Sequence, residues 1–230
     1  MKQINKYIVE RLHINKDTGN RHYNYHPKTK NELEELVYKL IKERENDGDL
    51  NDIDTSKITD MSLLFYDSNF NGDISKWNVS NVKDMHGMFF KSDFNGDISQ
   101  WDVSNVKDMS YMFSYSKFTG ENGDISEWDV SNVKNMYALF YNSIFNGDIS
   151  NWDVSNVENM HGIFAKSKFT SKNGDISKWD VSNVKNMGYM FYNSKFNGDI
   201  SNWNVNKVED MRSMFYGSPL EKNPPKWYKE

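Results

Sequence analysis

The sequence predicts an α/β solenoid, a single domain in which short units of one kind are stacked in chain order. Three observations support this prediction. The 230 residues are enough for one domain with a sizeable core. Tryptophan recurs at intervals of 24 or 27 residues. Only 37% of the residues are hydrophobic although 15% are aromatic, so the few large apolar side chains must be placed regularly.

Composition excludes several classes of protein. The chain has no cysteine, which rules out a disulfide scaffold, a thiolate zinc site and a cysteine nucleophile. The net charge of -5 argues against a nucleic-acid ligand. No apolar run has the length that membrane insertion needs, and residues 1–30 lack the apolar segment of a secretory signal. We therefore expect a cytoplasmic or particle-associated protein rather than a classically secreted one.

Three columns of residues share one repeat interval. They are Trp77, Trp101, Trp128, Trp152, Trp179, Trp203 and Trp227; Met61, Met85, Met109, Met136, Met160, Met187 and Met211; and the Gly-Asp pairs that begin at residues 72, 96, 123, 147, 174 and 198. A period of this length is typical of units that bury their apolar face only by stacking on one another. About seven units of 24–27 residues are predicted, with a β-solenoid as the alternative fold.

One unit combines two periodicities. Ile98, Trp101 and Val103 have the spacing of a leucine-rich-repeat strand, with Asp102 turned outward between two buried neighbours. Asn105 then suits the N-cap of a short helix. The apolar residues of that helix follow at steps of three and four: Val106, Met109, Met112 and Phe113. The unit is therefore predicted to be a strand followed by a short helix.

The ends of the chain are predicted to cover the stack. Residues 1–47 are predicted to form an N-terminal segment with a helical cap, residues 48–218 the repeats, and residues 219–230 a C-terminal cap. Pro224 and Pro225 within this last cap are expected to stop the stack. The cap helix over residues 31–45 has one apolar face, made of Leu33, Leu36, Val37, Leu40 and Ile41. A shorter helix is expected around Ile4, Tyr7, Ile8 and Leu12.

The recurring core W-D-V-S-N-V-x-x-M-x-x-M-F closely resembles the repeat of the BspA-like leucine-rich family of bacterial surface proteins. The resemblance covers residues 48–218. It implies a leucine-rich-repeat-like, non-enzymatic recognition scaffold, often a portion of surface proteins that act in adhesion or host contact. The family brings no catalytic residues, so the resemblance assigns none to this chain.

Four aspartates lie between tryptophan and valine in successive units: Asp102, Asp129, Asp153 and Asp180. On a parallel sheet the strands lie about 4.8 Å apart, so these carboxylates would repel one another unless something offsets their charge. In one interpretation each carboxylate accepts a hydrogen bond from a nearby backbone N–H, serine or asparagine. In the other, this acidic stripe is a docking surface for a basic patch or a metal cation.

A second column of aspartates follows glycine: Asp73, Asp97, Asp124, Asp148, Asp175 and Asp199. Calcium could bind between such turns, but the spacing matches neither an EF-hand nor a calcium-binding β-roll. An ordinary turn is favoured, and we expect no metal and no cofactor. No unit acquires an acid or histidine cluster of its own, so no catalytic residues are predicted.

The residue after the core phenylalanine is often aromatic. This outer aromatic row consists of Tyr66, Phe90, Tyr141, Tyr192 and Tyr216. Exposed aromatic rows often mark an interface, although a belt that covers the edge of the core is the other interpretation. The predicted function is recognition of a protein or glycan ligand without catalysis, in adhesion or attachment. The alternatives are an intracellular or phage-encoded interaction protein or inhibitor and, less favoured, a glycan-active enzyme.

Overall fold

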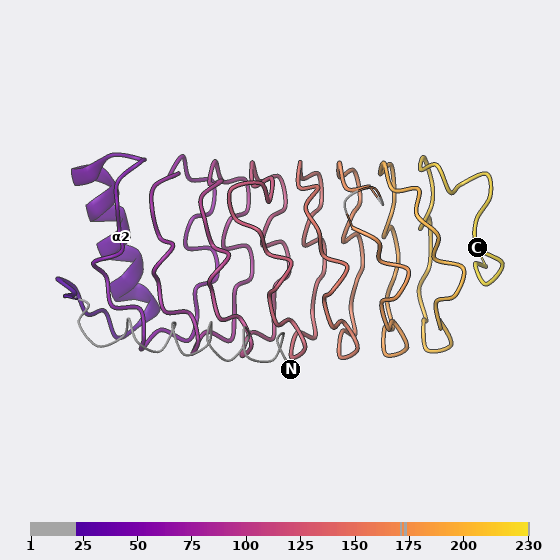
Figure 1. The fold of residues 1–230 in the computed structure, drawn as a ribbon, viewed down its shortest axis with the longest axis horizontal. Helices are drawn as coiled ribbons and strands as arrows, with labels where there is room; N and C mark the ends of the chain where they lie inside the picture. Colours follow the sequence, from indigo (N-terminus) through magenta and orange to yellow (C-terminus); the bar gives the residue numbers. More distant parts are fainter. Residues whose placement is uncertain (1–21, 171, 173, 230) are drawn as a thin grey trace, which may run out of the picture.

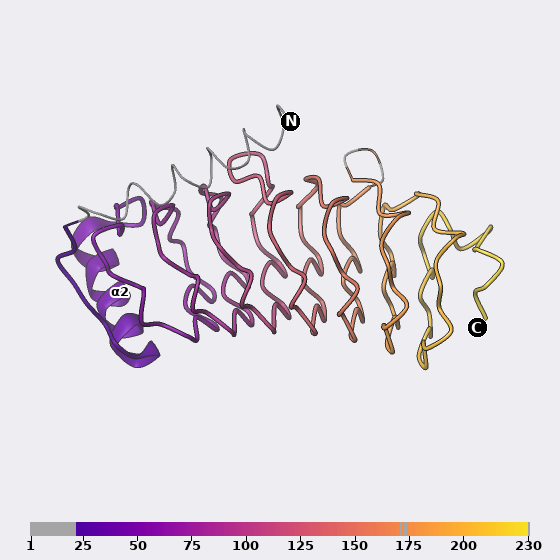
Figure 2. The ribbon, with the colours of Figure 1, turned by 60° about the horizontal axis from the view of Figure 1, so that its bottom comes forward.

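The structure, a computed structural model, describes residues 22–170, 172 and 174–229. Within these residues one helix, α2 (Lys30–Arg44), lies at one end of a row of coils (Figure 1). The coils lie side by side in chain order, and the C-terminus lies at the far end of the row from α2 (Figure 2). The short helix predicted around Ile4, Tyr7, Ile8 and Leu12 lies outside the described residues.

Helix α2 is the cap expected over residues 31–45. Thr29 is its N-cap, and the Thr29 hydroxyl oxygen accepts a hydrogen bond from the Glu32 N–H at 3.3 Å. The fully buried residues of α2 are Leu33, Val37 and Leu40. They belong to the same buried cluster as Leu50 in the first coil. The apolar face of α2 therefore covers an end of the row that would otherwise expose apolar side chains to water.

Seven coils follow α2, and each begins with a Gly-Asp pair. Coils 1 to 7 begin at residues 48, 72, 96, 123, 147, 174 and 198. Parallel bridges join neighbouring coils at the residue before each methionine of the repeat. The bridged residues are, in order, Asp60, Asp84, Asp108, Asn135, Asn159, Asn186 and Asp210. Because the register is the same at every step, each column of the sequence becomes a column in space.

In the segment after each methionine, successive backbone N–H groups donate alternately to the next coil and to their own coil. In coil 3 the Tyr111 N–H donates to the Tyr137 carbonyl oxygen of coil 4 at 2.8 Å. The next N–H, that of Met112, instead returns to the Met109 carbonyl oxygen within coil 3 at 3.2 Å. Coils 1 to 6 all show this pattern. Each such segment is thus a run of tight turns attached to the coil that follows it.

The predicted short helix at residues 106–113 is therefore wrong. Tyr111 has a φ of 57°, which a right-handed helix does not contain. The predicted strand at residues 98–103 is also wrong, because the Trp101 N–H closes a turn onto the Ile98 carbonyl oxygen and the bridge lies further on, at Asp108. Apolar spacing located the buried side chains, but successive turns produce the same three- and four-residue steps as a helix.

Each tryptophan binds the preceding coil. The indole N–H of Trp128 donates to the Ile98 carbonyl oxygen at 3.1 Å, and all seven tryptophans from Trp77 to Trp227 make this bond at 2.9–3.2 Å. Trp128 is only 4% exposed, so its one donor needs this partner. The tryptophan segments lie over one another and share one interior, as the sequence predicts.

A stack of phenylalanine rings runs through the interior of every coil. This inner phenylalanine stack consists of Phe65, Phe89, Phe113, Phe140, Phe164, Phe191 and Phe215. Neighbouring ring centroids are 5.6–5.9 Å apart and the ring planes are within 13° of parallel. One coil contributes one ring, so the rings are buried only because the coils are stacked.

Asn105 does not cap a helix but joins two coils. Its side-chain amide donates to the Ser80 carbonyl oxygen of the preceding coil at 2.8 Å. The equivalent residues Asn81, Asn132, Asn156 and Asn183 make the same bond. Since no helix follows Asn105, there is no free helical N–H to cap, and the amide is used between coils instead.

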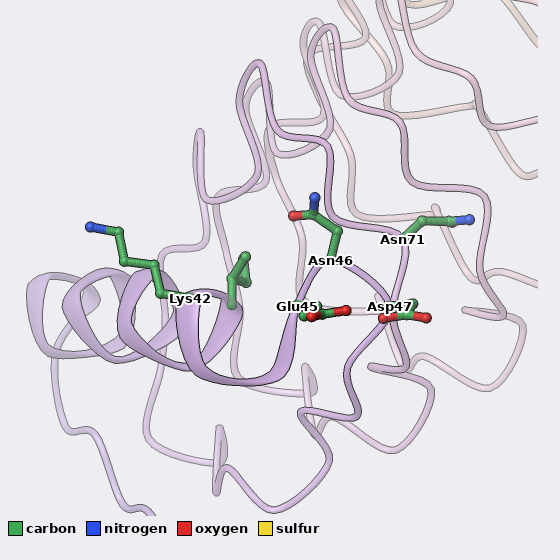
Figure 3. A pocket seen from close by; sticks show the side chains of 6 residues that line it. Lys42, Glu45, Asn46, Asp47 and Asn71 are labelled. Atoms are coloured by element: carbon green, nitrogen blue, oxygen red, sulfur yellow. The ribbon is translucent and has the colours of Figure 1, made fainter.

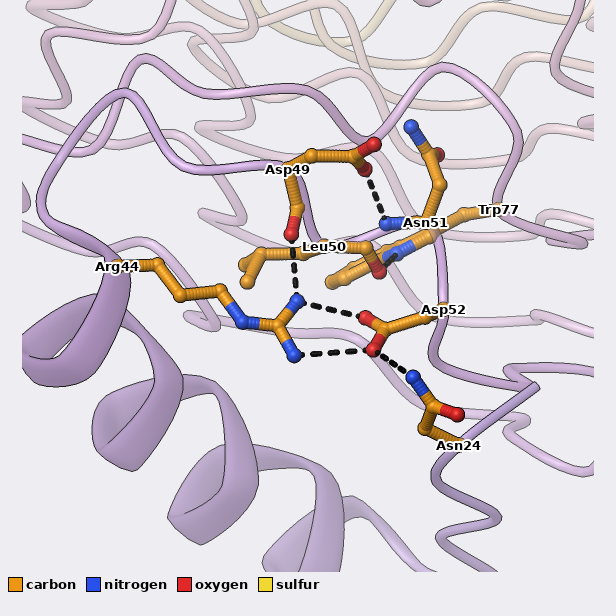
Figure 4. A network of polar contacts seen from close by, with 7 residues as sticks. All are labelled: Asn24, Arg44, Asp49, Leu50, Asn51, Asp52 and Trp77. Atoms are coloured by element: carbon orange, nitrogen blue, oxygen red, sulfur yellow. Dashed lines mark hydrogen bonds and ion pairs between the residues drawn. The ribbon is translucent and has the colours of Figure 1, made fainter.

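Arg44, the last residue of α2, attaches the helix to coil 1 (Figure 4). Its guanidinium donates to both carboxylate oxygens of Asp52, at 2.7 and 2.9 Å, and to the Asp49 carbonyl oxygen at 2.7 Å. The Asn24 amide donates to Asp52 at 2.8 Å. The bond from Arg44 lowers the pKa of Asp52 below its ordinary value. A charged pair thus fixes the junction between α2 and coil 1.

A half coil that contains Pro224 and Pro225 follows coil 7. Pro224, followed by Pro225, stands where an eighth coil would hold isoleucine, and proline has no N–H to donate. Trp227 nevertheless fills the tryptophan position. Its indole N–H donates to the Ile200 carbonyl oxygen at 3.0 Å and its ring lies 6.3 Å from that of Trp203. This half coil covers coil 7.

Candidate functional site

An aromatic hollow of about 500 Å³ lies on the outer surface of coils 2 to 6, over the turns that follow the methionine column. Its walls are the rings of Phe90, Tyr111, Tyr115, Tyr137, Tyr141, His161, Tyr189 and Tyr192. Ala138, Gly162 and Ala165 are buried and form its floor, and Lys166 also lines it. The hollow therefore combines large aromatic walls with a floor of small residues.

The backbone of the turns positions part of these walls. The second residue after each methionine has a φ between 49° and 63° in every coil: Leu63, Gly87, Tyr111, Ala138, Gly162, Tyr189 and Ser213. This left-handed conformation suits glycine and costs a bulky residue about 1 kcal/mol or more. Tyr111 and Tyr189 adopt it nonetheless, and both line the hollow. Backbone strain of this kind is often retained where it positions a functional side chain.

Four rings form a chain of contacts across the hollow. The Tyr111 and Tyr137 centroids are 4.9 Å apart, those of Tyr137 and His161 are 5.0 Å apart with planes within 5°, and those of His161 and Tyr189 are 5.3 Å apart. His161 Nδ1 also lies 3.2 Å from Asn186 Oδ1. Each ring restricts its neighbours, so the wall is ordered before any ligand arrives.

Lys166 is the only Lys, Arg, Asp or Glu among the lining residues. Its ammonium nitrogen lies 5.5 Å from the centroid of the Tyr141 ring. A hydrogen bond from Lys166 lowers the pKa of Tyr141, and a bond to Tyr141 raises the pKa of Tyr115. Burial, with a smaller contribution from Tyr137, raises the pKa of Tyr111 to about 12. The hollow is therefore aromatic, with one positively charged side chain among its lining residues.

The structure brings Phe90, Tyr141 and Tyr192 of the outer aromatic row into this hollow. Tyr66 and Tyr216 lie beside it: Tyr66 stacks on Phe90 and Tyr216 on Tyr192, each with centroids 5.4 Å apart. The row lies on the outside of turns, since the helix expected beneath it is not formed.

Sequence reasoning missed five aromatic residues of the hollow: Tyr111, Tyr115, Tyr137, His161 and Tyr189. These residues occupy positions whose residue type changes from coil to coil, in contrast to the constant tryptophan and methionine columns. The change of residue type from coil to coil was the signal that could have identified these positions. Aromatic residues that appear at variable positions of a repeat are not required by the stack.

The aspartates of the acidic stripe form hydrogen bonds within their own coils. Asp102 accepts from the Ser104 N–H at 3.1 Å and from the Ser104 hydroxyl at 2.6 Å. Asp129, Asp153 and Asp180 accept from the backbone N–H two residues later at 3.0 Å. In Asp180 the bonds from Ser182 lower the pKa. These are the bonds of the local-turn interpretation, and a docking role for the stripe stays a prediction.

The aspartates of the second column make the same kind of turn. Asp73, Asp97, Asp124, Asp148, Asp175 and Asp199 each accept from the serine N–H two residues later, at 2.8–2.9 Å. Across the part of the chain that the structure describes, no three histidine, aspartate or glutamate side chains gather as a metal ion would require. Each aspartate of both columns thus accepts a hydrogen bond that closes a turn of its own coil.

A second hollow, of about 560 Å³, lies where α2 ends (Figure 3). It is lined by Ile41, Lys42, Glu45, Asn46, Asp47 and Asn71. The polar side chains among these are exposed, and Lys42 points away from the carboxylates of Glu45 and Asp47 (Figure 3). Because no side chains converge here, the aromatic hollow is the stronger candidate for a binding site.

Comparison with known families adds one finding. The profile of a family described as Mycoplasma protein of unknown function, DUF285, matches residues 32–122 and 114–227. The chain belongs to the DUF285 family. The two DUF285 matches together span nearly all of α2 and the seven coils, so the resemblance to a repeat family is supported at that coarse level. No curated protein and no solved structure matches the chain.

The aromatic hollow lies inside the DUF285 region. Phe90 and Tyr111 fall in the first match, and the lining residues from Tyr137 to Tyr192 fall in the second. The hollow is thus built from the repeats themselves rather than from a segment added to them. Among the described residues, no helix of this DUF285 protein is both long enough and apolar enough to span a membrane.

Proposed function

We propose that this DUF285 protein is a non-enzymatic recognition scaffold whose aromatic hollow contacts a macromolecular ligand. The observation that carries the proposal is the gathering of eight aromatic rings on the outside of the coils, around a hollow of about 500 Å³. Aromatic side chains are enriched at protein interfaces, because they offer a large contact area with few rotatable bonds. Most of the tryptophan column, most of the methionine column and the inner phenylalanine stack are buried inside the coils, whereas these rings lie on the outside.

We also propose that the scaffold is a solenoid of the turn-based β type, rather than a leucine-rich repeat with helices. Bridges and backbone bonds at each step support this choice. Such a stack suits recognition, because rings that are fixed before binding lose little conformational entropy when the ligand arrives. The ring contacts from Tyr111 to Tyr189 fix the wall in this way.

Adhesion or attachment is the form of recognition that we favour, in line with the resemblance to BspA-like surface proteins. An intracellular or phage-encoded interaction protein or inhibitor would use the same hollow. A glycan-active enzyme has less support, since glycoside hydrolysis needs two carboxyl groups at a defined separation. No aspartate or glutamate is among the residues that line the hollow.

Affinity capture with mass spectrometry, run with three forms of the chain, tests this proposal. The double variant Tyr111→Ser/Tyr189→Ser removes two rings of the hollow. Tyr38→Ser is the matched control, because Tyr38 lies on α2 and is 63% exposed. We expect the wild type and the control to capture one partner in equal amounts, and the double variant to capture at least about tenfold less.

Thermal melting of each form confirms that the variants are folded. Equal capture by the folded double variant would show that the hollow is not the ligand surface. Cleavage of a glycan by the purified protein, abolished by substitution of a single aspartate, would instead show that the protein is an enzyme.

A further inference from the structure

We infer that the hollow contains one vacant ring position, and that this position accepts an aromatic side chain flanked by an acidic residue of a protein partner. The inference rests on the proposed function and names the ligand chemistry of that same surface.

The outer aromatic row is interrupted by Ser114 in coil 3 and by Ala165 in coil 5. In coil 3 the next residue, Tyr115, supplies a ring whose centroid lies 5.7 Å from that of Phe90 and 5.3 Å from that of Tyr141, whereas in coil 5 the next residue is Lys166. Where the row is complete, neighbouring coils place their rings 5.4 Å apart, as in Tyr192 and Tyr216. In coil 5 the corresponding residue is Ala165, between Tyr141 in coil 4 and Tyr192 in coil 6. Coils two steps apart are separated by roughly 10 Å at strand spacing. One aromatic ring, stacked on both neighbours, fills such an interval.

Small residues keep this position empty. Ala138 and Ala165 are the only two alanines in the sequence, and both line the hollow. A Cβ atom added at Gly162 would meet one atom within 4 Å, the Ala165 Cβ at 3.9 Å, whereas a Cβ at the equivalent Gly87 would approach Leu63 to 2.7 Å. Crowding and a left-handed φ both favour glycine in coil 2, whereas in coil 5 only the φ of 63° does, and the space beside Gly162 is open.

Ring orientation favours a flat side chain over a sugar. Within the outer aromatic row, Tyr66 and Phe90 lie within 11° of parallel and Tyr192 and Tyr216 within 14°, so these rings face one another along the row and present their edges outward. A glycan laid across the row would meet ring edges. At the vacant position the row has no ring from coil 5 between Tyr141 and Tyr192, and an inserted ring can stack there.

The positive charges beside the hollow favour an acidic residue next to the inserted ring. Lys166 lies over the face of Tyr141, and Lys91 lies over Phe90 with its nitrogen 5.7 Å from the ring centroid. These two cations border the hollow on a chain whose net charge is -5, while no acid lines it. An inserted ring takes the place of the exposed Lys166 ammonium on Tyr141. The ammonium then pairs with a carboxylate next to that ring.

The two alanines allow a direct test by NMR, because a chain labelled with ¹³C only at alanine methyl groups gives two signals, both from the hollow. The probe is the peptide acetyl-Gly-Ser-Asp-Phe-Asp-Ser-Gly-amide, added to the full chain. One control peptide has leucine in place of phenylalanine, and a second has lysine in place of both aspartates. A neutral oligosaccharide, cellohexaose, is the fourth probe.

We expect the probe peptide to shift both methyl signals in a saturable way, and the two control peptides to bind at least about tenfold more weakly. Ala165→Tyr fills the vacant position, so the Ala138 signal should no longer respond. Ala165→Ser, the matched control, keeps the position empty and should retain the response. Lys166→Gln should abolish the preference for aspartate but keep the preference for phenylalanine over leucine.

The inference is wrong if the peptide shifts neither signal at millimolar concentration, if leucine replaces phenylalanine without loss, or if Ala165→Tyr binds as well as the wild type. Saturable shifts with cellohexaose alone would also overturn it, in favour of a glycan. Any of these results leaves the proposed function standing as long as Tyr111→Ser/Tyr189→Ser loses the captured partner. The two failures are thus distinguishable.

Discussion

The inner phenylalanine stack and the outer aromatic row occupy adjacent residues of the same turns, but only the inner stack is complete. Phe140 is fully buried between rings 5.7 and 5.9 Å away, whereas its neighbour Tyr141 is half-buried and faces a coil that has Ala165 in place of a ring. The inner position keeps phenylalanine in all seven coils, while the outer one holds tyrosine, phenylalanine, serine or alanine.

This difference separates two uses of a repeated sequence. A buried position must match its copies above and below, because a missing ring would leave a cavity in a close-packed interior. A ring that is missing from an outward position leaves a hollow open to solvent rather than an internal cavity, so the residue there can change and build a surface. Positions that are constant across the coils therefore indicate the stacked interior, and positions that vary indicate the candidate site.

The largest effect on stability is expected from truncating a ring of the inner phenylalanine stack, compared with truncating its outer-row neighbour in the same coil. Phe140→Ala should lower the free energy of unfolding by about 3–5 kcal/mol, since it opens a cavity in the inner phenylalanine stack. Tyr141→Ala removes a half-buried ring and should cost about 1 kcal/mol or less. Urea unfolding followed by circular dichroism measures both. Similar losses for the two variants would show that the outer row also holds the coils together.

A smaller loss is expected from Trp128→Phe. The change removes the hydrogen bond to the Ile98 carbonyl oxygen, at 3.1 Å, and leaves that buried oxygen without its partner. We expect a loss of about 1–3 kcal/mol. Trp227→Phe at the partly buried C-terminal end is the control and should cost less, because water can replace the lost bond there. Equal losses at both sites would mean that the indole bond contributes little.

The sequence could predict the stacking of the coils, because stacking depends on the constant positions. Trp128 and Met136 repeat at a constant interval, and constant columns imply stacking whatever the backbone does. The conformation within a coil was not predictable in the same way. Val106 to Phe113 has the apolar spacing of a helix, and the φ of 57° at Tyr111 has no sequence signature because tyrosine rarely adopts it.

The candidate site was predictable only in part, for a related reason. Phe90, Tyr141 and Tyr192 were found because they share one column with other aromatics. Tyr137 and Tyr189 come from different columns and are joined through His161, whose ring contacts both. Contacts that join different columns of neighbouring coils cannot be obtained from the repeat interval alone.

Acid should lower the stability of the folded chain by a modest amount. Hydrogen bonds to the turn aspartates lower the pKa values of Asp180 and Asp199, and Arg44 lowers that of Asp52. A carboxyl group whose pKa is lower in the folded chain contributes stability above its unfolded pKa of about 3.9, and this is lost as the pH falls through the folded value.

We therefore expect a constant melting temperature between pH 7 and pH 5, and a fall of a few degrees below about pH 4. Differential scanning calorimetry across this range is the measurement. Because the hollow has no carboxylate, the decrease should be the same in Tyr111→Ser/Tyr189→Ser as in the wild type. A melting temperature that stays constant down to pH 2 would show that these hydrogen bonds do not favour the charged carboxylates.

The smallest change in stability, and the sharpest test of the comparison, is expected from replacing Tyr189 by glycine. Tyr189 has a φ of 56°, so Tyr189→Gly relieves about 1 kcal/mol of backbone strain while it removes ring contacts of similar value. The net change in the free energy of unfolding should lie within about 1 kcal/mol of zero. Tyr192→Gly is the matched control, because Tyr192 lines the same hollow without a positive φ, and it should cost about 2 kcal/mol. If the two variants lose equal stability, the left-handed turn imposes no strain on Tyr189, and the structure then gives no reason to regard that ring as held in place for a ligand.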